Sequence, residues 1–79
     1  MKQVKVLGTG CANCRTTVKL IEEEAQARGV DIQVEKVEKI EEIVAAGVLR
    51  TPGVIVDGKI VHSGGVPRRE AIAGWLQAA

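Results

Sequence analysis

The chain has few aromatic residues, no long apolar run and no excess of charge of either sign. Among Phe, Tyr and Trp only Trp75 occurs, so the core must be built from Val, Ile, Leu and Ala. No segment approaches the roughly 18 consecutive apolar residues that a membrane-spanning helix needs, and we expect no membrane association. The formal net charge is only +1, without runs of like charge, which argues against a nucleic-acid partner.

The remaining composition suits one small domain over residues 1–79. Hydrophobic residues make up 46% of the chain and charged residues 27%, as in soluble globular proteins. The N-terminus has the pattern of a short strand and not of a secretory signal, so we expect a cytoplasmic protein. We also expect the protein to be a monomer. In the cytoplasm thiols stay reduced, and a disulfide there is usually catalytic or regulatory.

Two alternating segments predict a pair of strands. Residues 3–7 alternate, with Val4 and Val6 on one face, and the segment 32–37 begins in the same way, with Ile32 and Val34 on one face. A helical segment separates the two, so a parallel pair with a right-handed crossover is expected. Val37 falls outside the alternation and leaves the end of the second strand undefined.

Apolar residues recur at helical spacing in three further segments. Gly29 and Gly47 are positioned to end the first two helices, and Pro67 to open the last. The predicted buried faces are Cys14, Val18, Ile21 and Ala25 in the first helix, Ile40, Ile43 and Val44 in the second, and Ile72, Trp75 and Leu76 in the third.

Between the second and third helices, Asp57-Gly58 predicts a tight hairpin turn between two apolar strands, and Gly64-Gly65 ends the second of them. The predicted order is therefore β-α-β-α-β-β-α. This is an α/β fold with a mixed four-stranded sheet flanked by helices.

Residues 8–14 read GTGCANC, which holds the only two cysteines of the chain at a C-x-x-C spacing. Cys11 falls at the start of the first helix, where unpaired N–H groups favour a thiolate, and Arg15 adds a cation one turn later. These groups should lower the pKa of Cys11 below the free-cysteine value of about 8.5. Cys14 falls on the apolar stripe and should be more buried and less reactive. An exposed nucleophile beside a sheltered resolving thiol is the arrangement that disulfide exchange requires.

The same two thiolates would also suit a soft metal ion such as copper(I). The GxxCxxC run resembles the copper-metallochaperone motif, although Thr9 and Gly10 stand where that family has Met and Thr. A closed zinc site needs four ligands, and only His62 remains as a third candidate. The metallochaperone family ends on a strand, with the order β-α-β-β-α-β, whereas this chain is predicted to end on a helix.

The segment TPGVIVDGKIVHSGGVP, with the C-x-x-C, resembles the thioredoxin and glutaredoxin superfamily over essentially the whole chain. Within it, the chain resembles the small thioredoxin-like group called redox-active disulfide protein 2. The resemblance implies a thiol–disulfide oxidoreductase whose redox-active disulfide, Cys11–Cys14, needs no cofactor or metal. It also implies a cis Thr51-Pro52 bond, with the Thr51 backbone pairing to an incoming substrate chain and Gly64 and Gly65 completing that surface.

The resemblance also bears on which molecule reduces the protein. Glutaredoxins usually carry Asp after the glycine pair for glutathione, whereas Val66 and Pro67 follow Gly65 here. We therefore expect protein disulfides as substrates and a flavin-dependent dithiol reductase, in preference to glutathione, as the donor.

Overall fold

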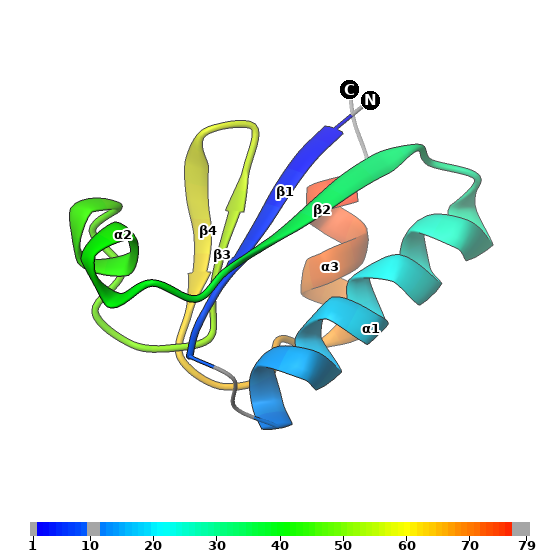
Figure 1. Cartoon of the computed structure of the whole chain (residues 1–79). Helices are drawn as coiled ribbons and strands as arrows, with labels where there is room; N and C mark the ends of the chain where they lie inside the picture. The colour runs from blue at the N-terminus through cyan, green and yellow to red at the C-terminus, as the bar shows by residue number, and fades with distance from the viewer. Residues whose placement is uncertain (1, 10–11, 77–79) are drawn as a thin grey trace.

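The computed structural model describes residues 2–9 and 12–76, and these form the predicted order of elements (Figure 1). The elements are β1 (Lys2–Leu7), α1 (Ala12–Arg28), β2 (Ile32–Val37), α2 (Ile40–Ala45), β3 (Gly53–Val56), β4 (Lys59–Ser63) and α3 (Arg69–Leu76). Within the described part of the chain, no helix has the length and apolar character needed to cross a bilayer.

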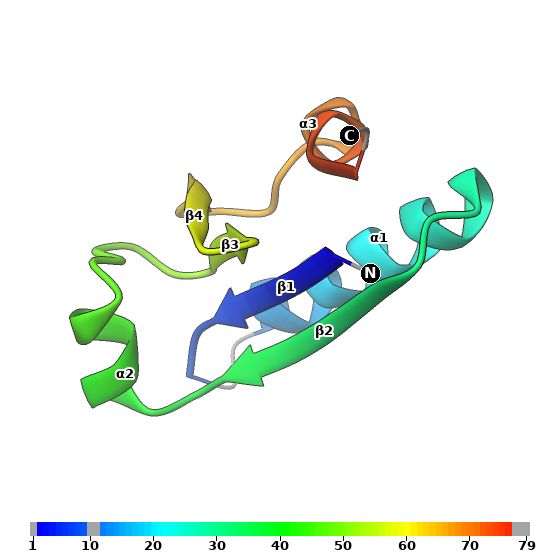
Figure 2. The same cartoon turned by 90° about the horizontal axis from the view of Figure 1, so that it is seen from above.

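The four strands form one mixed sheet in the order β2-β1-β3-β4. β1 pairs parallel with β2, and β3 is antiparallel to both β1 and β4. Helices α1 and α3 cover one face of this sheet, whereas α2 lies on the other side (Figure 2). The predicted α/β fold, its helix between the second and third strands and its parallel first pair are thus confirmed.

The main core lies between the sheet and helices α1 and α3. Val4 and Val6 point into this core because side chains alternate along β1. The predicted buried face of α1 packs against them. Trp75 packs against this cluster but stays partly exposed. The buried members are Val4, Val6, Val18, Ile21, Ala25, Val54, Val56, Ile72 and Leu76.

A second, smaller cluster on the opposite face explains why Val37 broke the alternation. Leu7 and Val37 are paired across β1 and β2, and both pack with Ile43 of α2 and with Val48. Val37 is therefore the last residue of β2 and faces α2 rather than α1.

The predicted buried face of the second helix is wrong in two of its three residues. Ile43 is buried, but Ile40 and Val44 are 63% and 66% exposed. The reason is length: α2 has six residues, less than two turns, and its end of the sheet offers a small apolar surface that Ile43 and Val48 fill.

The hairpin and the last helix follow the sequence signals with one correction. Asp57 and Gly58 have φ values of 49° and 86°, the left-handed pair that this tight turn requires. Helix α3 begins at Arg69, two residues after Pro67. The carbonyl of Arg68 accepts the N–H of Ile72, so helical hydrogen bonding starts after the proline and not at it.

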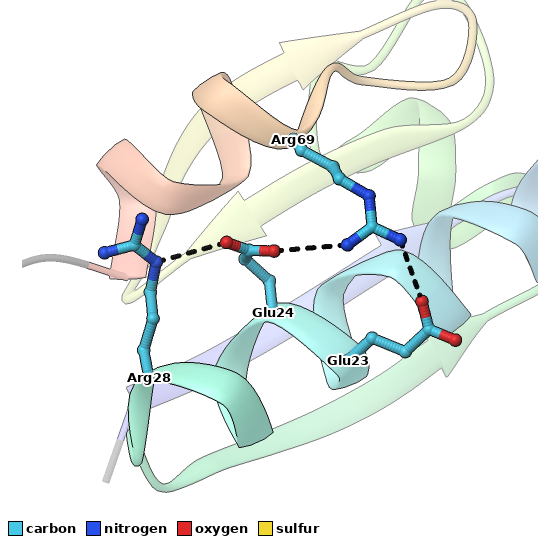
Figure 3. A network of polar contacts seen from close by, with 4 residues as sticks. All are labelled: Glu23, Glu24, Arg28 and Arg69. Atoms are coloured by element: carbon cyan, nitrogen blue, oxygen red, sulfur yellow. Dashed lines mark hydrogen bonds and ion pairs between the residues drawn. The ribbon is translucent and has the colours of Figure 1, made fainter.

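Ion pairs join the two helices that share a face of the sheet (Figure 3). Arg69 of α3 reaches Glu23 and Glu24 of α1, at 3.1 and 3.4 Å. Glu24 also pairs with Arg28 one turn along α1, at 3.2 Å. This cluster, the α1–α3 ion-pair network, ties the start of the last helix to the middle of the first.

Candidate active site

Cys14 occupies the first turns of α1, at the end of the molecule where β1 stops (Figure 1). It is 8% exposed and in the disulfide-bonded form. It lies on the helix face that also buries Thr17, Val18 and Ile21, so its predicted shelter from solvent is confirmed. Cys11 lies outside the described residues, and its reactivity and role remain predictions.

Gly8 brings the end of β1 against the sulfur of Cys14. A Cβ added at Gly8 would overlap the Sγ of Cys14, and it would lie 3.5 Å from the Cβ of Thr51. Gly8 does not have a positive φ, so the space beside it, and not its backbone conformation, demands glycine. The sequence analysis gave Gly8 no role, although its place between the strand and the C-x-x-C was a signal for it.

Thr51, like Cys14, lies beside Gly8, and Pro52 follows it in the chain. The Thr51-Pro52 peptide bond is cis, as the resemblance implied. The Pro52 side chain is fully buried, whereas Thr51 is exposed. Thr51 is therefore at the surface while its neighbour is anchored in the interior.

The Gly64-Gly65 turn is hydrogen-bonded to the segment Arg50–Pro52, which we call the proline loop. Gly64 and Gly65 have φ values of 87° and 74°, which side-chain-bearing residues rarely adopt. The N–H of Gly64 donates to the Pro52 carbonyl at 3.0 Å, and the Ser63 hydroxyl donates to the Arg50 carbonyl at 3.2 Å. The structure thus brings together the two motifs that the sequence analysis selected separately.

A cavity of about 80 Å³ opens behind Cys14. Arg15 lines it, so the cation predicted to favour a thiolate adjoins the same space as the Cys14 side chain. Lys36 and Glu38, at the end of β2, also line it and were not anticipated. The lining residues are Val6, Gly8, Cys14, Arg15, Val18, Lys36 and Glu38.

His62, the third candidate metal ligand, makes local contacts instead. Its Nε2 lies 2.9 Å from the Gly65 carbonyl, where an Nε2–H donates, and its ring lies 5.9 Å from that of Trp75. Across residues 2–9 and 12–76, no three His, Cys, Asp or Glu side chains gather in a way that could hold a metal ion.

Comparison with known proteins agrees with this arrangement. The family model described as a thioredoxin domain matches residues 2–77. A thioredoxin of Methanothermobacter thermautotrophicus is 36% identical over 72 residues, which cover 91% of this chain and 94% of the relative. A thioredoxin of Methanocaldococcus jannaschii is also 36% identical, over 78 residues that cover 99% of this chain and 90% of the relative. With its sheet order, its proline loop and these matches, the chain belongs to the thioredoxin-domain family.

Proposed function

We propose that this protein is a thiol–disulfide oxidoreductase that uses Cys11 and Cys14 as its dithiol/disulfide pair. The observation that carries the proposal is the convergence of Cys14, Gly8 and Thr51 beside the Gly64 turn. Buried Cys14 next to exposed Thr51 provides a reacting group and a place where the backbone of a substrate chain can pair. The thioredoxin relatives support the same reaction class.

The proposed reaction proceeds in two exchanges. The Cys11 thiolate attacks one sulfur of a partner disulfide; the partner S–S bond breaks, a mixed disulfide forms and one partner thiolate leaves. Cys14 then loses its proton and attacks the Cys11 sulfur, which releases the second partner thiolate. The protein ends with a Cys11–Cys14 disulfide and has given two electrons to the partner. The two partner thiolates take up one proton from Cys14 and one from solvent, which received the Cys11 proton when its thiolate formed.

The remaining residues hold the partner and return the protein to its reduced form. Thr51 and the Gly64-Gly65 turn position the substrate chain, and Arg15 favours the thiolate at the start of α1. A flavin-dependent dithiol reductase supplies the two electrons that reopen the disulfide. We place this chemistry in the cytoplasm and expect the protein to act as a monomer.

A trapping experiment tests the roles of the two thiols. Cys14 is 8% exposed, so it should resolve the mixed disulfide and not start the attack. We expect Cys14→Ser to accumulate a mixed disulfide with a peptide disulfide, because no resolving thiol remains. Cys11→Ser should trap several-fold less. Both species are quantified by intact mass spectrometry after acid quenching.

Two results would contradict the proposal. Equal trapping by the two variants would mean that neither thiol is the nucleophile. The alternative of soft-metal carriage is tested with the reduced wild-type protein: retention of copper(I) against a strong chelator, combined with no disulfide reduction, would replace the oxidoreductase by a metal carrier.

A further inference from the structure

Arg50 is a charged residue beside the surface that we assign to substrate binding, and the catalytic scheme does not use it. It directly precedes Thr51, and its carbonyl accepts the Ser63 hydroxyl. Its own backbone is therefore fixed within the proline loop, beside the Gly64 turn.

The side chain of Arg50 is laid along the Gly64 turn. A Cβ added at Gly64 would lie 3.1 Å from the Arg50 Cβ and 3.2 Å from its Cδ. The aliphatic stem therefore occupies the space that a side chain at position 64 would need. The N–H of the same glycine donates to the Pro52 carbonyl. Contact along the stem limits the positions that the guanidinium can reach.

No carboxylate of the protein neutralises this guanidinium in the described part of the chain. The ion pairs there involve Lys2 with Asp57 and the α1–α3 network, and Arg50 belongs to neither. The residues around it, from Leu49 to Pro52 and from Ser63 to Val66, include no acid. Arg50 is also exposed and directly precedes Thr51, so its charge is accessible to a chain that binds at Thr51.

We propose that Arg50 is a specificity-determining residue that selects protein disulfides flanked by a carboxylate. This inference rests on the proposed function, since it assigns the substrate class of the same site. A substrate strand paired to the Thr51 backbone would carry its neighbouring side chains past Arg50, where Asp or Glu would gain a charge-assisted contact. A lysine at that position would meet a like charge.

The test uses three synthetic peptide disulfides that differ only in the residue beside the reactive cysteine: Asp, Asn or Lys. Their rates of reduction by the reduced protein are divided by their rates with dithiothreitol, which removes intrinsic differences in reactivity. We expect the wild-type protein to favour Asp over Lys by about three- to ten-fold at low salt, the size of one exposed charge contact and one like-charge contact. High salt should reduce the ratio toward one.

Four variants separate charge from shape. Arg50→Lys should keep the preference, Arg50→Gln should abolish it while keeping a long stem, and Arg50→Glu should reverse it. Lys59→Glu is the matched control, because it changes the net charge equally at the far end of β4, and it should leave the preference intact.

The outcomes are distinguishable. If all three peptides are reduced at equal normalised rates by the wild-type protein and by Arg50→Glu, the assignment of Arg50 is wrong while the oxidoreductase stands. If the wild-type protein reduces none of them, both proposals fall. Slow reduction of every peptide by Arg50→Gln with an unchanged Asp/Lys ratio would also overturn the assignment, because a purely structural role lowers all rates together.

Discussion

The candidate site depends on two glycines, whose lack of a side chain leaves room for neighbouring atoms. At Gly8 the missing Cβ admits the sulfur of Cys14, and at Gly64 it admits the stem of Arg50. The two glycines differ in a second respect, since Gly64 has a positive φ and Gly8 does not. Gly8 therefore offers the cleaner test of close approach, without backbone strain.

We expect Gly8→Ala to destabilise the fold by about 1–3 kcal/mol, the usual cost of forcing an extra carbon into a packed site. The loss should appear in urea unfolding and be accompanied by slower peptide reduction. Gly74→Ala is the control: Gly74 lies in α3 with open space beside it, so alanine should stabilise the helix by about 1 kcal/mol.

A double-mutant cycle identifies the clashing atom. In a Cys14→Ala background the Sγ is absent, and the next contact of the added Cβ is an ordinary 3.5 Å. Gly8→Ala should then cost much less than in the wild-type protein. An unchanged cost in both backgrounds would show that the sulfur is not what excludes a side chain at position 8.

At the scale of elements, α1 has two tasks. Its first turns carry Cys14, and its middle anchors α3 through the α1–α3 ion-pair network. Only residues 66–68 separate the Gly64-Gly65 turn from α3. The network therefore also fixes the position of the segment that follows this turn. Its pairs are partly exposed: Arg69 is 57% exposed and Glu24 15%.

We expect Arg69→Ala to lower the free energy of unfolding by about 0.2–1 kcal/mol, the usual range for exposed pairs. The difference from wild type should shrink when thermal unfolding is repeated near 1 M salt, because salt screens these charges. Arg68→Ala serves as the control, since Arg68 joins none of the ion pairs in the described residues. A loss for Arg69→Ala that does not change with salt would point to packing of the arginine stem instead.

The sequence predicted the elements best where a single physical period governed them. Alternation located β1, and the four-residue stripe located the buried face of α1. It failed for α2, because Ile40 and Val44 have the spacing of a buried face but the sheet leaves them no surface to cover. Helical spacing states which residues share a face, and tertiary structure decides whether that face is buried.

For the molecule as a whole, stability comes from one main core and a small second one. In a chain of 79 residues, little apolar surface is available and the net free energy of folding is small. Ile21 is fully buried at the centre of the main core. A fully buried side chain such as Ile21 therefore contributes a large share of the net free energy of folding.

We expect Ile21→Ala to cost about 2–5 kcal/mol, enough to bring a domain of this size close to unfolding at room temperature. Ile40→Ala removes the same atoms from a side chain that is 63% exposed, and it should change stability by about 0.5 kcal/mol or less. Both are measured by urea unfolding of the oxidised protein. Similar losses for the two variants would mean that Ile40 is covered in solution.

The candidate site was predictable in its motifs and not in its contacts. Cys14, Thr51-Pro52 and Gly64-Gly65 were selected from residue types at characteristic places in the chain. Gly8 and Arg50 were missed, because their importance comes from which atoms lie beside them in space. An arginine in a loop has no sequence signature of its own. The place of Gly8 between the strand and the C-x-x-C was a signal, but it does not reveal which atom lies beside the glycine.

The sheet gives the molecule two opposite poles. β1 begins and α3 ends at one pole, and α1 begins at the other, with Cys14 in its first turns (Figure 1). A label, a solid support or a neighbouring domain joined ahead of β1 or after α3 would therefore attach at the pole opposite Cys14. The fold can thus be tethered at that pole, or linked in tandem, while the pole that carries Cys14 stays open to large partners.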